Sequence, residues 1–166
     1  LKILCSPIFS SFLSIETISV SDKRHDILVK TDPNNKDVSH ITLKVSPDRK
    51  WISYYYSGYG EGNPPQVDNN TYSFDVTSRV SKVVFNSGYF RGWRGNKIVY
   101  QLRSDDNDIW EISPDGSDKK LLLNVGEGEL LELVASPDGN KLLYQIRDYK
   151  NKPFSARLYL YDLSTG

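Results

Sequence analysis

Residues 132–148 read ELVASPDGNKLLYQIRD, and this stretch decides the fold. It places the turn signal Ser136-Pro137-Asp138-Gly139 between two apolar runs. Pro suits the second position of a type I turn, Asp bonds to the local backbone, and Gly tolerates positive φ. A near copy, LKVSPDRKWISYYYS, occupies Leu43–Ser57. Two copies of one hairpin in a single chain indicate an internal repeat.

The strand after this turn occurs three times. Its copies are RKWISYYY at Arg49–Tyr56, GNKIVYQLR at Gly95–Arg103 and GNKLLYQIR at Gly139–Arg147. The matching tyrosines, Tyr54, Tyr100 and Tyr144, are 46 and 44 residues apart. This period is close to the roughly 40–45 residues of a four-stranded propeller blade.

The other strands of the unit repeat as well. A following strand ends in an acid, an apolar residue and a hydroxyl at Thr71–Ser78, Asp108–Gly116 and Arg157–Gly166. Fourth strands are predicted at Ser81–Asn86 and Asp118–Asn124, and inner strands at Ser39–Val45 and Glu129–Ala135. In the middle unit, Gly92-Trp93-Arg94-Gly95 is expected to replace the Ser-Pro-Asp-Gly turn, and the segment 18–32 resembles an outer strand pair.

These repeats predict an all-β chain, a partial β-propeller of four-stranded antiparallel blades with about three to three and a half blades. The predicted divisions are an N-terminal segment, residues 1–36, then blades at 37–84 and 85–126, and an incomplete blade at 127–166. A single four-stranded sheet cannot bury both of its faces, so neighbouring blades must stack. A stack that stays open would expose apolar blade faces and favour self-association.

Composition narrows the classes of partner. The 166 residues contain 21 Lys plus Arg and 21 Asp plus Glu, so no excess charge favours nucleic acid. The one cysteine, Cys5, cannot form an internal disulfide. No apolar run reaches the roughly 20 residues of a membrane span. Residues 1–20 are moderately apolar and are expected to form an ordinary strand, with a targeting remnant as the alternative.

The repeats resemble those of the TolB-like, WD40-like (PD40) β-propeller family. The resemblance rests on Ser-Pro-Asp-Gly followed by an aliphatic strand ending in Tyr144, and on Asp108-Ile109-Trp110 leading to Asp115-Gly116. It covers most of the range 37–166. It implies a binding propeller located in the periplasm or secreted. Similar repeats build the N-terminal propellers of prolyl-oligopeptidase-type serine peptidases and also build oligogalacturonate lyases.

The sequence offers no catalytic constellation, so we expect no enzyme activity, no cofactor and no metal. A hydrolase would need Gly-x-Ser-x-Gly with a His and an acid, and the nearest stretch, NSGYF at Asn86–Phe90, lacks the first Gly. His25 is expected in solvent, and His40 in a loop or partly buried rather than as a ligand. The acidic residues 105–108 lack the alternation, Gly and distal Glu of a calcium loop.

Aromatic and basic residues supply the candidate binding surface. Tyr55 and Tyr59 lead into the long loop that contains Pro64 and Pro65, and Tyr with Pro gives rigid contact area. A second group, expected at the opposite end of the propeller, either anchors a partner or caps the middle blade. It consists of Arg91, Trp93 and Arg94.

Three functions remain open from the sequence. The first is a non-catalytic propeller that binds protein or polysaccharide partners. The second is the regulatory propeller of a prolyl-oligopeptidase-type peptidase, which a Gly-x-Ser-x-Gly motif downstream in the gene would favour. The third and weakest is a lyase of the oligogalacturonate kind, because such enzymes have histidine-rich metal sites and this chain has two histidines.

Overall fold

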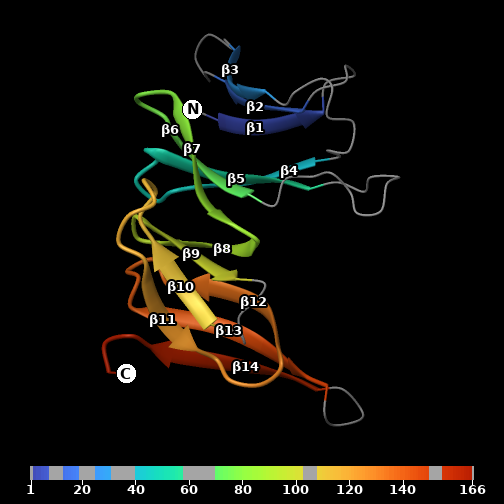
Figure 1. Cartoon of the computed structure of the whole chain (residues 1–166), viewed down its shortest axis with the longest axis vertical. Helices are drawn as coiled ribbons and strands as arrows, with labels where there is room; N and C mark the ends of the chain where they lie inside the picture. The colour runs from blue at the N-terminus through green and yellow to red at the C-terminus, as the bar shows by residue number, and fades with distance from the viewer. Residues whose placement is uncertain are drawn as a thin grey trace. The chain divides into compact units, whose positions relative to one another are not determined.

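The structure is a computed structural model that describes residues 2–7, 13–18, 25–30, 40–57, 70–102, 108–149 and 155–165. These residues form only strands, turns and connecting segments (Figure 1). The chain divides into two compact units. One consists of Leu1–Leu43 with Tyr54–Asn69, and the other of Lys44–Ser53 with Asn70–Gly166.

The N-terminal sheet contains three strands, two of which lie within residues 1–20. Strands β1 (Lys2–Pro7), β2 (Leu13–Ile18) and β3 (His25–Lys30) form an antiparallel sheet in the order β1-β2-β3. Ile15, at the centre of β2, is fully buried. Only β3 lies within residues 18–32, where the sequence predicts an outer strand pair, and its partner β2 lies earlier in the chain and ends at Ile18.

The rest of the chain forms three meandering sheets, as predicted (Figure 1). The first has the order β4-β5-β6-β7 and the second β8-β9-β10-β11, whereas the third contains β12-β13-β14. The strands are β4 (His40–Val45), β5 (Trp51–Ser57), β6 (Asn70–Asp75), β7 (Val80–Asn86), β8 (Gly88–Arg94), β9 (Lys97–Leu102), β10 (Asp108–Ile112), β11 (Lys120–Asn124), β12 (Glu129–Ala135), β13 (Lys141–Asp148) and β14 (Ser155–Asp162). The blade boundaries at residues 36, 84 and 126 stay a prediction.

The two Ser-Pro-Asp turns have the same internal hydrogen bonds. In the later turn, Ser136 Oγ donates to Asp138 Oδ1 at 2.5 Å and accepts from the Lys141 amide at 2.9 Å. In the earlier turn, Ser46 Oγ donates to Asp48 Oδ1 at 2.6 Å and accepts from the Trp51 amide at 3.0 Å. The repeat seen in the sequence is thus a repeat of local structure.

Arg49 is the residue that departs from this turn pattern. The fourth turn position is left-handed in both copies, with φ of 60° at Arg49 and 74° at Gly139. A side chain in this conformation costs about 1–2 kcal/mol, whereas Gly adopts it freely but loses about 0.5–1 kcal/mol of chain entropy. We expect Arg49→Gly to raise the free energy of unfolding in urea by about 0.5–1 kcal/mol. A lower value than that of the unaltered chain would contradict this turn assignment.

The middle hairpin differs from the sequence prediction. Gly92, Trp93 and Arg94 lie in strand β8, and the turn that follows is Gly95-Asn96. The pairing of β8 with β9 shifts between Phe90 and Gly92, so a bulge lies at this point. Gly92 has φ of 156°, which a residue with a side chain rarely adopts. The prediction that these residues form the turn was therefore wrong: they extend an inner strand instead.

The main core lies between the second and third sheets. Val99 and Ile109 from β9 and β10 cluster with buried residues of the third sheet, which are Leu130, Leu133, Leu142 and Ile146. Each of these six side chains is at most 6% exposed. Burying one such side chain stabilises a fold by about 1.5–3 kcal/mol. The stacked sheets therefore share one apolar layer, which the sequence predicts from its alternating strands.

Candidate functional site

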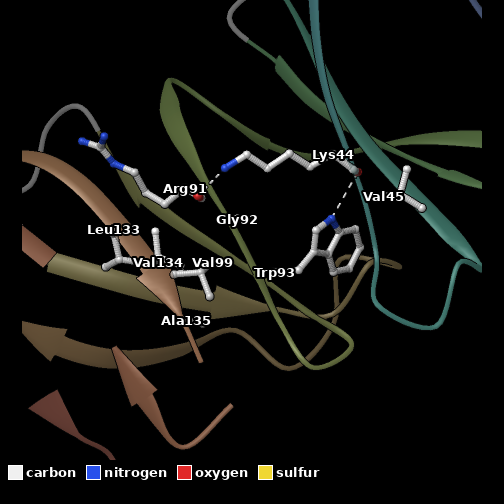
Figure 2. Close-up of a pocket in the computed structure, with 9 residues that line it drawn as sticks. All are labelled: Lys44, Val45, Arg91, Gly92, Trp93, Val99, Leu133, Val134 and Ala135. Atoms are coloured by element: carbon white, nitrogen blue, oxygen red, sulfur yellow. Dashed lines mark hydrogen bonds between the residues drawn. The ribbon is translucent and has the colours of Figure 1, made fainter. Parts of the chain in front are cut away.

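A pocket of about 400 Å³ opens where the inner strands end. We call it the inner-strand pocket (Figure 2). It lies between the ends of β4, β8 and β12, with one residue added from β9. Its lining residues are Lys44, Val45, Arg91, Gly92, Trp93, Val99, Leu133, Val134 and Ala135.

Arg91 fixes one side of the pocket through its guanidinium group. Its Nη1 donates to the Leu131 carbonyl oxygen at 3.2 Å, and its Nη2 donates to the Leu130 carbonyl oxygen at 3.0 Å. Nη2 also donates to Gln101 Oε1 at 2.5 Å. The guanidinium therefore joins β8 to β12.

Lys44 and Trp93 fix the other side of the pocket through two hydrogen bonds between β4 and β8, one donated from each strand. The Trp93 Nε1 group donates to the Lys44 carbonyl oxygen at 3.2 Å, and Lys44 Nζ donates to the Arg91 carbonyl oxygen at 3.1 Å (Figure 2). The Lys44 ammonium also lies 5.7 Å from the centre of the Phe90 ring, within cation–π range. The indole and the two basic side chains are thus held at one place by backbone contacts.

The pocket combines positive charge with an apolar wall. Lys44 is exposed, and no carboxylate among the described residues forms an ion pair with its ammonium group. The described lining residues include no Asp or Glu, and the wall is formed by Val99, Leu133, Val134 and Ala135. Such a site suits a ligand with an anionic group attached to a body that can lie against aromatic and aliphatic side chains.

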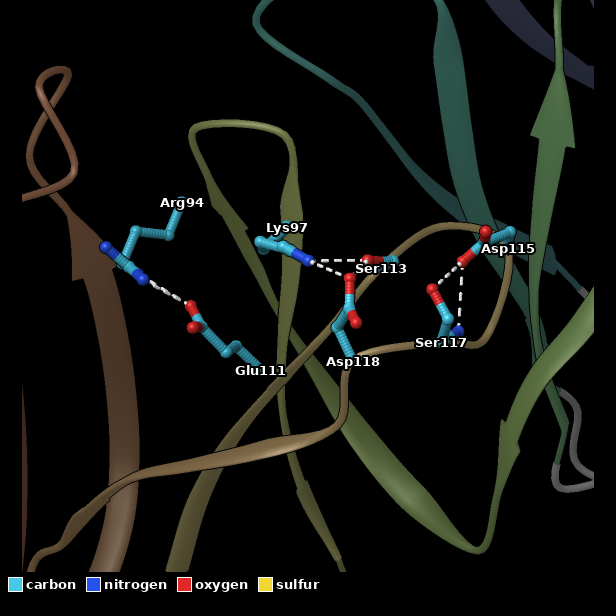
Figure 3. A network of polar contacts seen from close by, with 7 residues as sticks. All are labelled: Arg94, Lys97, Glu111, Ser113, Asp115, Ser117 and Asp118. Atoms are coloured by element: carbon cyan, nitrogen blue, oxygen red, sulfur yellow. Dashed lines mark hydrogen bonds and ion pairs between the residues drawn. The ribbon is translucent and has the colours of Figure 1, made fainter.

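Arg94 lies on the same strand but serves a different contact (Figure 3). Its Nε donates to Glu111 Oε2 at 2.9 Å, and Nη2 forms an ion pair with the same oxygen at 2.5 Å. Its Nη1 donates to the Gly139 carbonyl oxygen at 2.9 Å. Arg94 therefore clamps the second sheet to the Ser-Pro-Asp-Gly turn of the third sheet, and it does not line the pocket.

A second polar group in Figure 3 stabilises the turn after β10. Lys97 Nζ donates to Ser113 Oγ at 2.5 Å and to Asp118 Oδ2 at 3.0 Å. Asp115 Oδ1 accepts from the Ser117 amide at 2.9 Å. Asp115 and Asp138 thus accept hydrogen bonds within their own Ser-Pro-Asp-Gly turns.

The structure brings together two of the predicted site residues, Arg91 and Trp93. Tyr55 lies half-buried in β5. The remaining predicted residues, Tyr59, Pro64 and Pro65, lie outside the described residues. Sequence reasoning missed Lys44, although a signal exists: Lys44-Val45-Ser46-Pro47 and Val134-Ala135-Ser136-Pro137 are the same repeat positions, and only the first carries a charge.

The described residues do not group the side chains that a metal site needs. They contain no group of three or more His, Cys, Asp or Glu side chains that could hold a metal ion. The side chains of His25 and His40, and all of residues 105–107, lie outside the described part of the chain. The expectation that the chain is not an enzyme stays a prediction.

Several turn carboxylates have a pKa held below the ordinary value of 3.8. In each case the largest cause is a hydrogen bond to the ionised carboxylate. Side chains of serine donate in four of them: Ser46 to Asp48, Ser117 to Asp115, Ser136 to Asp138 and Ser164 to Asp162. The Thr77 amide donates to Asp75, and the Lys97 side chain donates to Asp118. A carboxyl group with a lowered pKa in the folded state contributes stability above its unfolded pKa and loses it as the pH falls through the folded value.

These lowered pKa values predict an acid-sensitive fold. The melting temperature should stay nearly constant from pH 7 to about 5 and fall progressively below about pH 4, because the unfolded chain then binds more protons. Asp138→Asn removes one titrating group and should flatten this fall, while it lowers stability at neutral pH. Melting curves followed by circular dichroism test both. A melting temperature that rises on acidification below pH 4 would contradict the pKa directions.

Comparisons with known proteins identify the architecture. No sequence profile of a known family and no curated protein matches the chain. TolB from Acinetobacter baumannii superposes with a TM-score of 0.65 at 17% identity, covering 99% of this chain and 38% of TolB. An oligogalacturonate lyase in complex with manganese gives 0.66 at 14% identity, covering 93% and 40%. A prolyl endopeptidase gives 0.67 at 9% identity, covering 97% and 24%.

The comparisons show the fold and not the function. The identities are low, and the chain spans less than half the length of each of these three proteins. The all-β meanders and their structural similarity show that the chain has the fold of a partial β-propeller. In the described residues, no helix is long and apolar enough to cross a membrane.

Proposed function

We propose that the chain is a non-catalytic β-propeller scaffold that binds a protein or polysaccharide partner at the inner-strand pocket. The observation that carries the proposal is the grouping of Lys44, Arg91 and Trp93 at the ends of the inner strands, with no Asp or Glu among the described residues of the lining. Since four strands of three sheets supply the lining, the site depends on the propeller stack. Rigid scaffolds of this kind commonly bind through the ends of their strands and loops.

The partner's contact group is anionic. A carboxylate can approach the exposed Lys44 ammonium, and the neighbouring Arg91 guanidinium adds favourable potential at the same place. An attached sugar ring or apolar side chain can then lie against Trp93 and the aliphatic wall. Both acidic peptides and acidic polysaccharides have this combination of groups.

The test is a titration with a hexaglutamate peptide and with an oligogalacturonate, each beside a neutral counterpart. Trp93 lines the pocket, so its fluorescence should change on binding, and Trp93→Phe identifies that contribution among the three tryptophans. We expect Lys44→Gln to weaken binding of the acidic probe about tenfold, because one charge-assisted hydrogen bond is lost. Lys120→Gln, an exposed lysine of β11, is the matched control and should have no effect.

Two outcomes would contradict the proposal. One is that neither acidic probe binds better than its neutral counterpart. The other is that Lys44→Gln and Lys120→Gln weaken binding equally, since the effect would then reflect the overall charge of the chain and not the pocket.

A second candidate function is the regulatory propeller of a prolyl-oligopeptidase-type peptidase. It is favoured by the similarity to the prolyl endopeptidase, of which this chain covers 24%. The discriminating observation is the gene: a Gly-x-Ser-x-Gly motif encoded downstream favours the peptidase. The same protein then has peptidase activity, which a chromogenic proline peptide would detect.

We propose that the protein acts in the periplasm or is secreted. The support is the resemblance of its repeats to those of TolB. The expected result is release of the tagged protein from its bacterial host by osmotic shock or its recovery from the medium. Recovery with a cytoplasmic marker enzyme alone would contradict this location.

A further inference from the structure

The inner-strand pocket takes the same two repeat positions from each of three inner strands. Lys44-Val45 and Val134-Ala135 directly precede the two Ser-Pro-Asp turns, and Gly92-Trp93 hold this place in β8. The partner of Trp93 on β9 is Ile98. The partner of Ala135 on β13 is Leu142, which is the same residue of the repeated strand. Equivalent backbone positions thus carry a cation in β4, a glycine in β8 and an aliphatic residue in β12.

Gly92 leaves an open space in front of the Lys44 ammonium group. An added Cβ atom at Gly92 would lie 3.8 Å from Lys44 Nζ, and no other described atom outside the neighbouring residues comes within 4 Å of it. Among the described residues, Lys44 Nζ donates one hydrogen bond, to the Arg91 carbonyl oxygen, whereas an ammonium group has three donors. A ligand oxygen placed over Gly92 can therefore accept a hydrogen bond from Lys44.

The polar side chains that line the pocket in the described part of the chain are donors only. They are those of Lys44, Arg91 and Trp93. The carbonyl oxygens of Lys44 and Arg91 already accept from Trp93 Nε1 at 3.2 Å and from Lys44 Nζ at 3.1 Å. A sugar ring brings several hydroxyl donors, and a donor that stays unsatisfied in a buried site is costly. This lining therefore suits a ligand that offers acceptors and few donors.

The rest of the lining suits a small aliphatic group. The indole N–H of Trp93 is used within the chain, so the indole ring offers the ligand apolar contact area. A volume of about 400 Å³ is near the lower end of the roughly 300–1,000 Å³ of ligand pockets, so a short group fits better than a length of polymer. The aliphatic wall consists of Val45, Val99, Leu133, Val134 and Ala135.

We propose that the inner-strand pocket binds the C-terminus of a partner polypeptide whose last residue is aliphatic. This inference rests on the function proposed above and narrows its partner to a protein with a free, apolar C-terminus. The carboxylate and the side chain of a C-terminal residue leave the same carbon atom. The carboxylate accepts from Lys44 over Gly92, while the side chain lies against the aliphatic wall. An internal Asp or Glu lacks the apolar group, and a sugar acid adds hydroxyl donors. Capture of a terminal carboxylate is a recurring mode of peptide recognition.

Matched peptides test the proposal by isothermal titration calorimetry. The free acid acetyl-Gly-Gly-Val-Leu is compared with its C-terminal amide, with the free acid acetyl-Gly-Gly-Val-Asn, and with tetragalacturonate. We expect the amide to bind about tenfold or more weakly, because a charge-assisted hydrogen bond is lost. The asparagine-ended peptide should weaken by a similar factor, since it loses apolar contact. Tetragalacturonate should bind more weakly than the leucine-ended acid.

Variants of Lys44 give a readout that a purely structural role would not change, namely the ratio of acid to amide affinity. Lys44→Gln should bring this ratio close to one, and Lys44→Arg should retain most of it, because the charge is kept. Lys120→Gln, at an exposed lysine of β11, should leave the ratio unchanged.

The outcomes separate this inference from the proposed function. An acid that binds no better than its amide, or a ratio unaffected by Lys44→Gln, would overturn the inference. Tighter binding of tetragalacturonate would also overturn it and leave the proposed function standing, and tighter binding of octanoate would assign the pocket to a lipid carboxylate instead. If none of the anionic probes binds, both the inference and the proposed function are wrong.

Discussion

Replacing Arg94 with Met lowers the free energy of unfolding by about 2–4 kcal/mol, because the carboxylate of Glu111 loses its cation while it stays buried. The side chains of Arg94 and Glu111 are 24% and 8% exposed. The expected cost is somewhat below the range for a fully buried pair, since water reaches part of the guanidinium. The hydrogen bond to the Gly139 carbonyl oxygen is lost as well. Urea unfolding followed by circular dichroism measures the change.

Arg147→Met provides the matched control for this prediction. Arg147 pairs with Glu129, and the two side chains are 43% and 48% exposed. An exposed pair contributes about 0–1 kcal/mol, so this variant should be nearly as stable as the unaltered chain. Adding Glu111→Leu to Arg94→Met should recover part of the loss, because the uncompensated charge is removed. Equal effects of Arg94→Met and Arg147→Met would contradict the clamp between the second and third sheets.

Leu142→Ala should have an effect of similar size, about 2–5 kcal/mol, because it opens a cavity in the shared core. Leu142 is fully buried and belongs to the cluster that also contains Val99 and Ile109 of the second sheet. The loss therefore reports on packing between sheets as well as within one. The midpoint of urea unfolding should fall accordingly, and the slope with urea should not change.

Leu121→Ala makes the same chemical change at an exposed position. Leu121 lies on β11 and is 43% exposed, so its truncation should cost well under about 1 kcal/mol. If the two alanine variants unfolded at the same urea concentration, the core assigned to the facing sheets would be wrong.

The sequence predicts the repeated strands because each unit has the same turn chemistry and alternation. Ser46 and Ser136 begin turns with the same hydrogen bonds, and Tyr100 and Tyr144 occupy the same place in β9 and β13. Strand β8 was missed because Gly88 and Gly92 weaken the strand pattern, and because a bulge breaks its alternation. The sequence does not predict two separate strands within residues 1–20, since this segment carries no turn signal of the repeat.

The pocket was only partly predictable for a different physical reason. Trp93 and Arg91 are unusual residue types for their position, so the sequence singles them out. Lys44 appears in the sequence as an ordinary solvent-facing residue of an inner strand. Only the stacking of the sheets, which brings the ends of β4, β8 and β12 together, shows that its ammonium group joins the other two. Convergence of distant strands is a property of tertiary structure that local sequence patterns do not contain.

The account depends on apolar sheet faces that are hidden by the neighbouring sheet. Methyl-labelled NMR of the chain tests this most directly, through nuclear Overhauser contacts between side chains of different sheets. We predict contacts from the Val99 or Ile109 methyl groups to those of Leu133 or Leu142. Spectra in which these methyl groups contact only residues of their own sheet would contradict the stacked propeller.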